Sequence, residues 1–415
     1  MMNYFQTLQY IHSLERFGCK PGLERVRFLC KAIGSPQDKL RIIHVAGTNG
    51  KGSTCTMLAE ICCAAGLKTG LYTSPYVIEF RERIRVNGTM ISEKDLCRWT
   101  ETLRDISAAA PESITEFEFI TSLAFAWFFE QGCDVVVLEV GMGGDWDATN
   151  VIPPPLCSVI TKISYDHMDF LGNTLTEITG RKCGIIKPGS PVVTTCEQPK
   201  EALAVIRKTA KKHSCELIIP EEKQLKIVSS DITGSEAILD GLPVRIPLLG
   251  QHMCRNALTA VMAARLLKLP DEAIQSGIAA VRIPARMELI SREPLVLLDG
   301  GHNPDGAQAL VSALSEHLPG QRFCAICGMM ADKDVEQYLR ILRPHVGRMI
   351  TCQPNNPRAL SAEELAARAR KIGYENAAPA ASMEEALQAA EYPLLICGSF
   401  YLAGGVRALY SSANS

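Results

Sequence analysis

The sequence predicts an α/β protein of two domains, each built around a mostly parallel sheet. Short runs rich in β-branched residues alternate with helical stretches along the whole chain of 415 residues. A glycine-rich loop stands between the first such run and a helix, and a second series of strand-like runs begins after residue 284. Because the chain is long for one hydrophobic core, we place a boundary at Pro284, which gives domains of 1–284 and 285–415.

The first domain begins its sheet with RIIHVAG (41–47), which leads into the glycine loop. The stretch that follows the loop, 53–66, has helical periodicity and ends at a glycine, as helices often do. Four further strands are predicted in KTGLYTS (68–74), CDVVVLEVGMGG (133–144), CSVITKIS (157–164) and SPVVTTC (190–196). Each run ends in glycine or polar residues, and open α/β sheets bind ligands at the carboxyl ends of their strands.

The second domain repeats this pattern without a glycine loop. Its strands are predicted in LVLLDGGHNP (295–304), FCAICGMM (323–330), RMITCQP (348–354) and PLLICGS (393–399). Helical segments such as DGAQALVSALSEHL (305–318) separate them. We therefore expect a smaller α/β domain beside the first.

Composition excludes several classes of protein. The chain has 43 basic and 45 acidic residues and a net charge of −2, so no long-range field favours nucleic acid or an anionic membrane. The N-terminus lacks the pattern of a secretion signal, and no apolar run reaches the about 18 residues that span a bilayer. We expect a cytoplasmic protein that binds small molecules.

The 16 cysteines are scattered through apolar runs, which indicates reduced and buried thiols. One pair, Cys324 and Cys327, has the C-x-x-C spacing of redox and zinc sites. Residues three apart in a strand point to opposite faces. We therefore predict that this pair packs in the core.

The glycine loop, HVAGTNGKGST (44–54), resembles a phosphate-binding loop but departs from the strict pattern G-x-x-x-x-G-K-[ST]. Val45 stands where the first glycine belongs, and Gly52 stands where the hydroxyl residue belongs. Its place between a strand and a helix still favours a phosphate cradle, because backbone N–H groups converge at a helix N-terminus. Lys51 would reach the β- and γ-phosphates, and Ser53 or Thr54 would bind Mg²⁺. The residues predicted to bind nucleotide are Gly47, Thr48, Asn49, Gly50, Lys51, Gly52, Ser53 and Thr54.

Other polar residues follow strands of the same sheet. Glu139 ends a buried strand, which is costly unless the carboxylate meets a cation; the alternative is a capping or salt-bridged glutamate. His167 follows another strand, and Lys182 lies in a helical stretch where it would by itself be a solvated lysine. Asp299 and His302 stand at the end of the first strand of the second domain. They would either contact a ligand or form the turn that follows the strand.

Ordered motifs over nearly the whole chain, from about Leu14 to Arg407, resemble the folylpolyglutamate synthases and bifunctional dihydrofolate synthases. These enzymes belong to the Mur ligase superfamily of ATP-dependent amide ligases. The motifs are HVAGTNGKGST, YTSPY, FRERIRVNG, FEFIT, LEVGMGGDWDATN, DHMDFLGNTLTEI, KCGIIKPGSPVV, LLGQHMCRNA, PARMEL, DGGHNP, GMMADKD, NPRAL and CGSFYLAG.

The resemblance implies a Mur-ligase-like fold, with a P-loop NTPase-like N-terminal domain and a smaller Rossmann-like C-terminal domain. It also implies that ATP activates a carboxylate of a folate, or of dihydropteroate, as an acyl phosphate that L-glutamate then attacks. The family is commonly monomeric, so a monomer is expected.

The resemblance also implies roles for single residues. The catalytic residues would be Lys51, Glu139, His167 and Lys182, the last as a carbamate. Two Mg²⁺ sites would use Ser53, Ser74 and Glu139 for the first and His167 for the second. ATP would be bound across the interdomain cleft by Asn256, Arg286, Asp299 and His302, and substrate by Arg83, Phe117, Asp147 and Ser399. Pterin contacts are expected from the loops 16–26 and 73–84.

Four positions depart from the family pattern. Asp145 stands where Arg is frequent, Arg181 where Glu is frequent, Met253 where Gln is frequent and Gly301 where Ala is frequent. Because the first two changes invert charge in opposite senses, we predict that Asp145 and Arg181 form a pair.

Three other functions remain open. A UDP-muramyl-peptide ligase is disfavoured because the loop begins at Gly47, which leaves no room for an N-terminal UDP-sugar domain, and because Gly52 is added. An ATP-binding regulator without turnover would explain the charge inversions. A simple P-loop kinase would leave the second domain unexplained.

Overall fold

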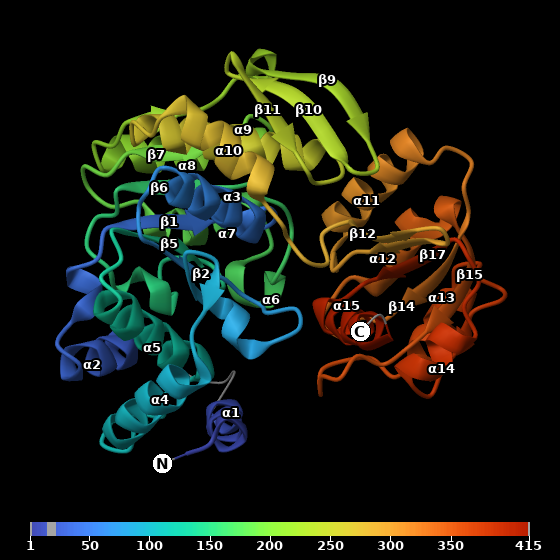
Figure 1. Cartoon of the computed structure of the whole chain (residues 1–415), viewed down its shortest axis with the longest axis horizontal. Helices are drawn as coiled ribbons and strands as arrows, with labels where there is room; N and C mark the ends of the chain where they lie inside the picture. The colour runs from blue at the N-terminus through green and yellow to red at the C-terminus, as the bar shows by residue number, and fades with distance from the viewer. Residues whose placement is uncertain (1, 15–21, 414–415) are drawn as a thin grey trace.

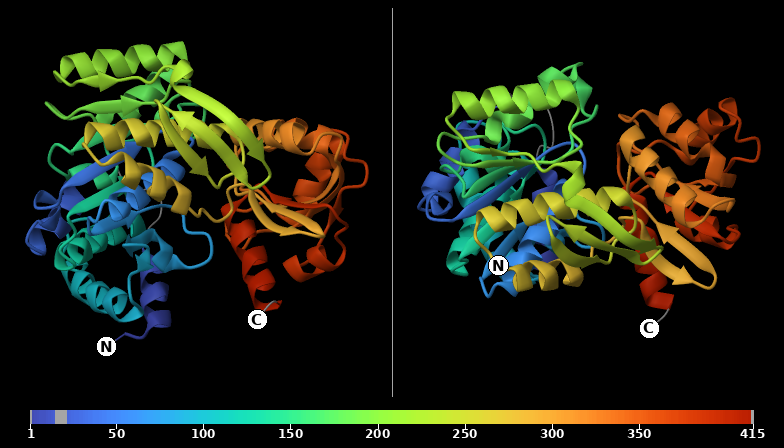
Figure 2. Two further views of the ribbon diagram at one scale, coloured as in Figure 1. Left: turned by 45° about the horizontal axis from the view of Figure 1, so that its top comes forward. Right: turned by 90° about the horizontal axis from the view of Figure 1, so that it is seen from above.

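The computed structural model describes residues 2–14 and 22–413. It has two α/β bodies that lie side by side, and the three-stranded sheet β9–β11 projects from the first body toward the second (Figures 1 and 2). Residues 281–287 connect the last helix of the first body to the first strand of the second. Within the part of the chain described, no helix is long and apolar enough to cross a membrane.

The first body is organised on an eight-stranded sheet with the order β4-β3-β2-β5-β1-β6-β7-β8. The six strands β2, β5, β1, β6, β7 and β8 run parallel to one another. Strands β3 and β4 continue the sheet beside β2 as an antiparallel edge. The strands are β1 (Ile42–Ala46), β2 (Thr69–Tyr72), β3 (Ile84–Val86), β4 (Thr89–Met90), β5 (Val135–Glu139), β6 (Cys157–Ile160), β7 (Val192–Thr194) and β8 (Leu217–Ile218). All five strands predicted for this domain are present.

Both faces of this sheet are covered, which explains why its central strands are apolar throughout. One core cluster joins β1 and β5 to α3, α9 and α10, and another joins them to α2, α4 and α5. The helices of this body are α1 (Tyr4–Ser13), α2 (Glu24–Ala32), α3 (Lys51–Ala64), α4 (Glu93–Ser107), α5 (Glu116–Glu130), α6 (Met168–Leu171), α7 (Leu175–Lys182), α8 (Lys200–Lys212), α9 (Gln251–Leu266) and α10 (Asp271–Ala280).

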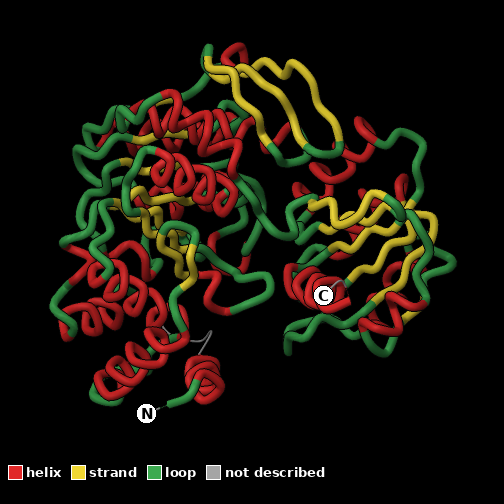
Figure 3. The backbone as a smooth tube through the Cα atoms, viewed as in Figure 1, coloured by secondary structure: helices red, strands yellow, loops and turns green. Residues whose placement is uncertain are grey.

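The sequence did not reveal the antiparallel sheet β11-β10-β9, which the tube view shows at the top of the molecule, between the two bodies (Figure 3). Its strands are β9 (Leu225–Asp231), β10 (Gly234–Leu239) and β11 (Leu242–Ile246). Much of β9 is exposed, so its apolar pattern is weak. The sheet reaches the second body through Ser230, whose Oγ lies 3.3 Å from His317 Nε2.

The second body has a six-stranded sheet with the order β12-β13-β17-β14-β15-β16. Only β12 is antiparallel to its neighbour. Its strands are β12 (Glu288–Arg292), β13 (Leu295–Leu298), β14 (Phe323–Cys327), β15 (Val346–Thr351), β16 (Ala378–Pro379) and β17 (Leu394–Cys397). Its helices are α11 (Pro304–His317), α12 (Val335–Leu342), α13 (Ala362–Lys371), α14 (Met383–Gln388) and α15 (Phe400–Ala413). The four predicted strands are confirmed.

The cysteine prediction is also confirmed. Cys324 and Cys327 are both buried in β14, and they belong to core clusters on opposite faces of the sheet. All cysteines in residues 2–14 and 22–413 are free thiols. The C-x-x-C pair therefore serves packing.

Candidate active site

The glycine loop has the geometry of a phosphate cradle. It joins β1 to α3, which begins at Lys51, so the N–H groups of the first helical turn face the loop. Gly50 has φ 87°, and a Cβ there would lie 2.5 Å from Asn256 Oδ1, so only glycine fits. The Lys51 ammonium donates to the carbonyl of Thr48 at 3.2 Å. The strand–loop–helix prediction is confirmed.

Glu139 lies beside this loop because β5 is the neighbour of β1 in the sheet. Its carboxylate is buried and accepts a hydrogen bond from the backbone N–H of Ser74, after β2, at 3.1 Å. Burial raises the pKa of Glu139, and the positive charges of Lys51 and Arg286 oppose that shift. The carboxylate thus occupies an environment that would gain from a further cation.

Lys182 ends α7 and points at the other side of the loop. Its ammonium is buried and donates to the carbonyl of Gly47 at 2.8 Å. Burial, together with the positive charge of Lys51, lowers the pKa of Lys182 to about 7. A substantial fraction of this amine is therefore neutral near physiological pH, and a neutral amine is nucleophilic.

His167 follows β6 and adopts a left-handed conformation, with φ 51°, immediately before α6. Burial lowers its pKa to about 4, although Asp166 acts in the opposite sense. Its imidazole is therefore neutral at pH 7 and has a free lone pair. Asp166 is partly buried, which raises its pKa, but His167 and Lys333 outweigh this and hold the pKa of its carboxyl well below the usual range.

The second body contributes residues at the carboxyl ends of β13 and β14. Asp299 is buried and accepts hydrogen bonds from the backbone N–H groups of Met287 at 3.1 Å and Gly301 at 2.8 Å. The Arg286 guanidinium lies 4.4 Å from the centre of the Phe400 ring. These side chains face the glycine loop across the cleft.

Direct contacts join the two bodies at this cleft. Asp305, at the start of α11, accepts from Asn49 at 2.6 Å and pairs with Lys162 at 2.6 Å. Lys333, after β14, pairs with Asp166 at 2.8 Å. The loop, the metal-ligand candidates and the second body are therefore held together in one site.

One cleft contains most of the predicted site residues. The predicted residues that line it are Thr48, Asn49, Gly50, Lys51, Gly52, Ser53, Ser74, Glu139, His167, Lys182, Asn256, Arg286, Asp299 and His302. Gly47 and Thr54 do not line this cleft, and the Thr54 hydroxyl is buried without a hydrogen-bond partner among the described residues. The assignment of separate roles to these residues stays a prediction.

The four predicted substrate residues do not line this cleft. Arg83 lies over the rings of Tyr76 and Phe80, at 5.3 Å from each. Asp147 is buried and accepts from the N–H of Met142 at 2.9 Å.

The other two substrate candidates also have internal partners. Phe117 packs against Tyr72, with ring centres 6.0 Å apart. Ser399 accepts from the N–H of Tyr401 at the start of α15. Of the first predicted pterin loop, residues 16–21 lie outside the described residues.

Several cleft residues escaped the sequence prediction. Lys162, Glu197, His252 and Asp305 line the cleft, and Lys333 pairs with Asp166 in its lining. Lys162 and Glu197 follow strands of the first sheet, and Lys333 follows β14, so a rule applied to every strand end would have found these three. Asp305 stands in the first turn of α11, directly after the GGHNP motif.

The predicted Asp145–Arg181 pair is confirmed. Arg181 Nη1 lies 3.0 Å from Asp145 Oδ2, and the guanidinium lies 4.4 Å from the centre of the Trp146 ring. Neither residue lines the cleft. At Gly301, a Cβ would lie 2.6 Å from Asp299 Oδ2, so glycine here allows that carboxylate to bond the Gly301 N–H. Met253 is buried, with its sulfur 4.0 Å from Asn256 Nδ2.

Removing the Asp145–Arg181 pair should have little effect. The two side chains are 35% and 47% exposed, and ion pairs of this kind contribute about 0.2–1 kcal/mol. In Asp145→Asn or Arg181→Gln, we expect the free energy of unfolding to fall by less than about 1 kcal/mol and turnover to change less than about twofold. Denaturant titration and a steady-state assay measure both quantities. A loss of turnover above tenfold in a folded variant would mean that the pair acts on the site.

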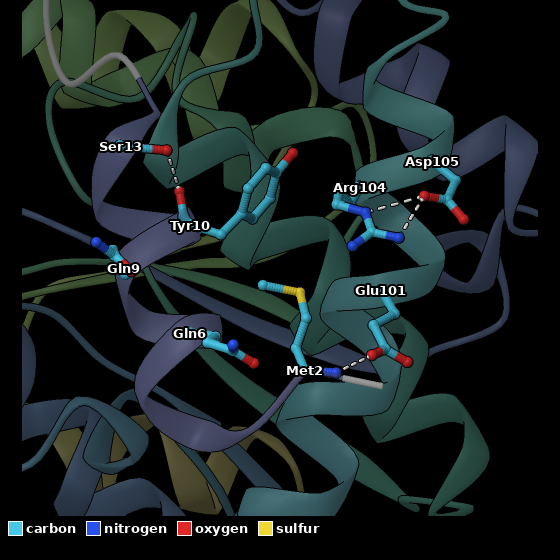
Figure 4. Close-up of a pocket in the computed structure, with 8 residues that line it drawn as sticks. All are labelled: Met2, Gln6, Gln9, Tyr10, Ser13, Glu101, Arg104 and Asp105. Atoms are coloured by element: carbon cyan, nitrogen blue, oxygen red, sulfur yellow. Dashed lines mark hydrogen bonds and ion pairs between the residues drawn. The ribbon is translucent and has the colours of Figure 1, made fainter.

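A separate pocket lies between α1 and α4 (Figure 4). There the Met2 N–H donates to Glu101, the Ser13 hydroxyl donates to the carbonyl of Tyr10 at 2.7 Å, and Arg104 pairs with Asp105 at 2.9 Å. This pocket has no residue in common with the cleft. These contacts engage the charged groups of the pocket with one another, and we assign it no ligand.

Comparison with known proteins gives two family matches. The Mur ligase middle domain matches residues 45–264, and the glutamate ligase domain of Mur ligases matches residues 285–399.

Individual relatives match over almost their whole length. The chain is 37% identical to a folylpolyglutamate synthase of Lacticaseibacillus casei, over 98% of both chains. It is 34% identical to a dihydrofolate synthase/folylpolyglutamate synthase of Bacillus subtilis, over 97% of this chain and 98% of the relative. Among solved structures, a Mycobacterium tuberculosis folylpolyglutamate synthase complexed with ADP has a TM-score of 0.89 at 30% identity, over 98% of both chains.

Proposed function

Since this chain belongs to the folylpolyglutamate synthase and dihydrofolate synthase branch of the Mur ligase family, we propose that it is an ATP-dependent ligase that adds L-glutamate to a folate. The observation that carries the proposal is the single cleft in which the glycine loop, Glu139 and Asp299 meet. A solved relative that is 34% identical, with a TM-score of 0.83, is described as a complex with AMPPCP and folate. Dihydropteroate is a second acceptor to be tested.

In this reaction the γ-phosphate of ATP passes to a carboxylate of the acceptor and forms an acyl phosphate. The amino group of L-glutamate attacks the acyl carbon, and the tetrahedral intermediate collapses to an amide and phosphate. Lys51 and the N–H groups of the loop, residues 47–54, hold the phosphates and neutralise their charge.

The donors at the loop fit Mg²⁺, which prefers oxygen ligands. We assign the first ion to Ser53, Ser74 and Glu139, which line the same cleft, and the buried carboxylate of Glu139 gains from a cation. His167, neutral at pH 7 and in the same cleft, is assigned to a second ion. Mg²⁺ would supply charge neutralisation at the phosphates.

Lys182 is assigned as a carbamate. The reaction of CO₂ with an amine needs the neutral form, and burial lowers the pKa of Lys182 to about 7. The carbamate would place a negative charge between Lys51 and the second cation site, where a cationic lysine is disfavoured. Labelling the protein with ¹³C-bicarbonate should give a carbamate NMR signal that is absent in Lys182→Ala.

The assignment of ATP contacts to Asn256, Arg286, Asp299 and His302 requires that residues 285–415 act as a domain that closes on residues 1–284. The contacts of Asp305 with Asn49 and Lys162 support closure onto the phosphate loop. For the substrate we keep Arg83, Phe117, Asp147 and Ser399 as proposed contacts, which would require movement toward the cleft on binding. We also propose that the protein is cytoplasmic, which the free thiols of the described residues support, and that it acts as a monomer.

The deciding experiment is phosphate release with Mg²⁺-ATP and L-glutamate. The acceptors to compare are dihydropteroate, a reduced folate monoglutamate and a UDP-muramyl peptide. We expect glutamate-dependent release with the folate. Release only with the UDP substrate would reassign the chain to the cell-wall ligases, and ATP binding without release for any acceptor would favour a regulator.

A further inference from the structure

The cleft continues beyond the reacting centre as a groove. A narrow pocket of about 60 Å³ has six lining residues in common with the cleft, among them Ser74, Glu139 and Phe400. A wider pocket of about 190 Å³ follows. Four residues line both of these pockets, and together they define what we call the arginine groove: Thr56, Leu71, Arg85 and Arg282. The groove therefore begins at the proposed metal ligands and leads away from them.

The walls of the groove belong mainly to the first body. Thr56 lies on α3, Arg85 on β3, and Arg282 just after α10. Helix α10 packs on α3, and Ile274 and Ile278 join the same core cluster as Leu58. Figure 1 shows these two helices side by side. Arg85 is carried by β3 of the first sheet, and Arg282 is the second residue of the segment 281–287 that connects the two bodies.

The two arginines are available to an anion. Arg282 is exposed, and its Nη1 donates to the carbonyls of Val281 at 2.7 Å and Ala279 at 3.4 Å; no carboxylate pairs with it among the described residues. Arg85 donates through Nε to the carbonyl of Glu82 at 3.0 Å, and its Nη2 is 3.9 Å from the Glu82 carboxylate.

Glu82 lines the narrow pocket and offsets the charge of Arg85 only in part, because their charged atoms are 3.9 Å apart. Its carboxylate accepts hydrogen bonds from the backbone N–H groups of Val77, Ile78 and Glu79, at 2.9–3.0 Å. The carboxylate is thereby turned toward that loop. At the outer end lies Glu60, whose pKa is raised by burial despite the opposing charge of Arg85.

We infer that the arginine groove binds the glutamate residues already attached to the acceptor, that is, an anionic oligoglutamate tail. The inference rests on the proposed function. Because ligation takes place at the terminal carboxylate, the earlier residues of the acceptor must lead away from the reacting centre. Each of those residues carries one free carboxylate, and guanidinium groups bind carboxylates through charge-assisted hydrogen bonds. The groove leaves the reacting centre and carries two such groups.

Glu60 sets the outer limit of this site. A tail that reaches the wider pocket brings another carboxylate beside Glu60, in a place where burial already disfavours negative charge. Like charges at short distance repel. The groove should therefore favour tails that end their contacts at Arg282 and Arg85.

The test compares acceptors of different tail length. In Arg282→Gln, we expect KM for a folate tri- or tetraglutamate to rise about fivefold or more, since one exposed charge contact is removed. KM for the monoglutamate, KM for L-glutamate and kcat should stay within about twofold of wild type. Glu60→Gln should act in the opposite direction and lower KM for the long acceptor. Arg207→Gln, on the exposed face of α8, is the matched control with no length dependence.

Each other outcome overturns the inference. An equal rise of KM for every tail length would show that the arginines do not bind the tail. A rise of KM for L-glutamate alone would assign the groove to the incoming amino acid. Failure of the wild-type protein to extend a folate monoglutamate would instead refute the proposed function, so the two failures are distinguishable.

Discussion

Replacing Lys51 with alanine should reduce glutamate-dependent phosphate release by on the order of 100- to 1000-fold, because that is the typical loss when a single group that stabilises transition-state charge is removed. Lys51 begins α3 at the phosphate loop and lines the cleft. Among the residues that the structure describes, its ammonium has one hydrogen-bond partner, the carbonyl of Thr48. The γ-phosphate would lose its positioned cation. A steady-state assay with saturating Mg²⁺-ATP measures the change.

The fold should survive this substitution. Alanine is a good helix former, and Lys51 contributes no ion pair among the described residues. Circular dichroism and thermal unfolding of Lys51→Ala should match the wild type. Turnover above about a tenth of the wild-type value in the folded variant would show that the phosphate site lies elsewhere. Lys208→Ala, on exposed α8, is the control for loss of a lysine.

Replacing Glu139 with alanine should lower turnover more than about 100-fold. Loss of a residue that only supports a metal ligand typically costs roughly 10- to 100-fold, and Glu139 is proposed to be a ligand itself. Glu139 is the carboxylate at the proposed first Mg²⁺ site, and it also positions the N–H of Ser74. Raising the Mg²⁺ concentration should restore part of the activity of Glu139→Gln, which retains one oxygen donor. The dependence of turnover on Mg²⁺ in the wild type, Glu139→Ala and Glu139→Gln measures this. Unchanged turnover in either variant would remove Glu139 from the site.

Glu139→Gln should leave the metal-free protein as stable as the wild type or more stable. Burial raises the pKa of Glu139 in the folded protein, so the folded state binds a proton here more tightly than the unfolded state. Near neutral pH the ionised carboxylate therefore destabilises the fold, and this penalty shrinks as pH falls through the raised pKa. Glu139→Gln should gain stability over the wild type at pH 7 and lose that advantage in acid. Thermal unfolding without Mg²⁺ at both pH values tests the sign.

Much of the fold was predictable because its central strands are local signals. A strand buried on both faces, such as β1 or β5, appears in the sequence as a continuous apolar run. A glycine loop between a strand and a helix indicates a phosphate-binding loop. The antiparallel sheet of β9, β10 and β11 was not predictable in this way. Much of β9 is exposed, and β10 and β11 pack on α9 and α10, which come later in the chain.

The sequence predicted which strand ends supply residues to the cleft, but it did not predict which side chains contact one another there. Ser74, Glu139, His167 and Asp299 could be expected at the carboxyl edges of their sheets. The sequence could not show that Asp305 joins Asn49 to Lys162, because 143 residues separate Asp305 from Lys162.

The sequence by itself determined the two parallel sheets, the phosphate loop and the pairing of opposite charges at Asp145 and Arg181. These features depend on neighbours along one strand or helix, or on matched changes of charge. Only the tertiary structure decided that Lys182 is buried against Gly47, that Lys333 reaches Asp166, and that a groove leaves the reacting centre. These depend on how the strands are ordered and how the two bodies face each other, since burial and charge act through space and not along the chain.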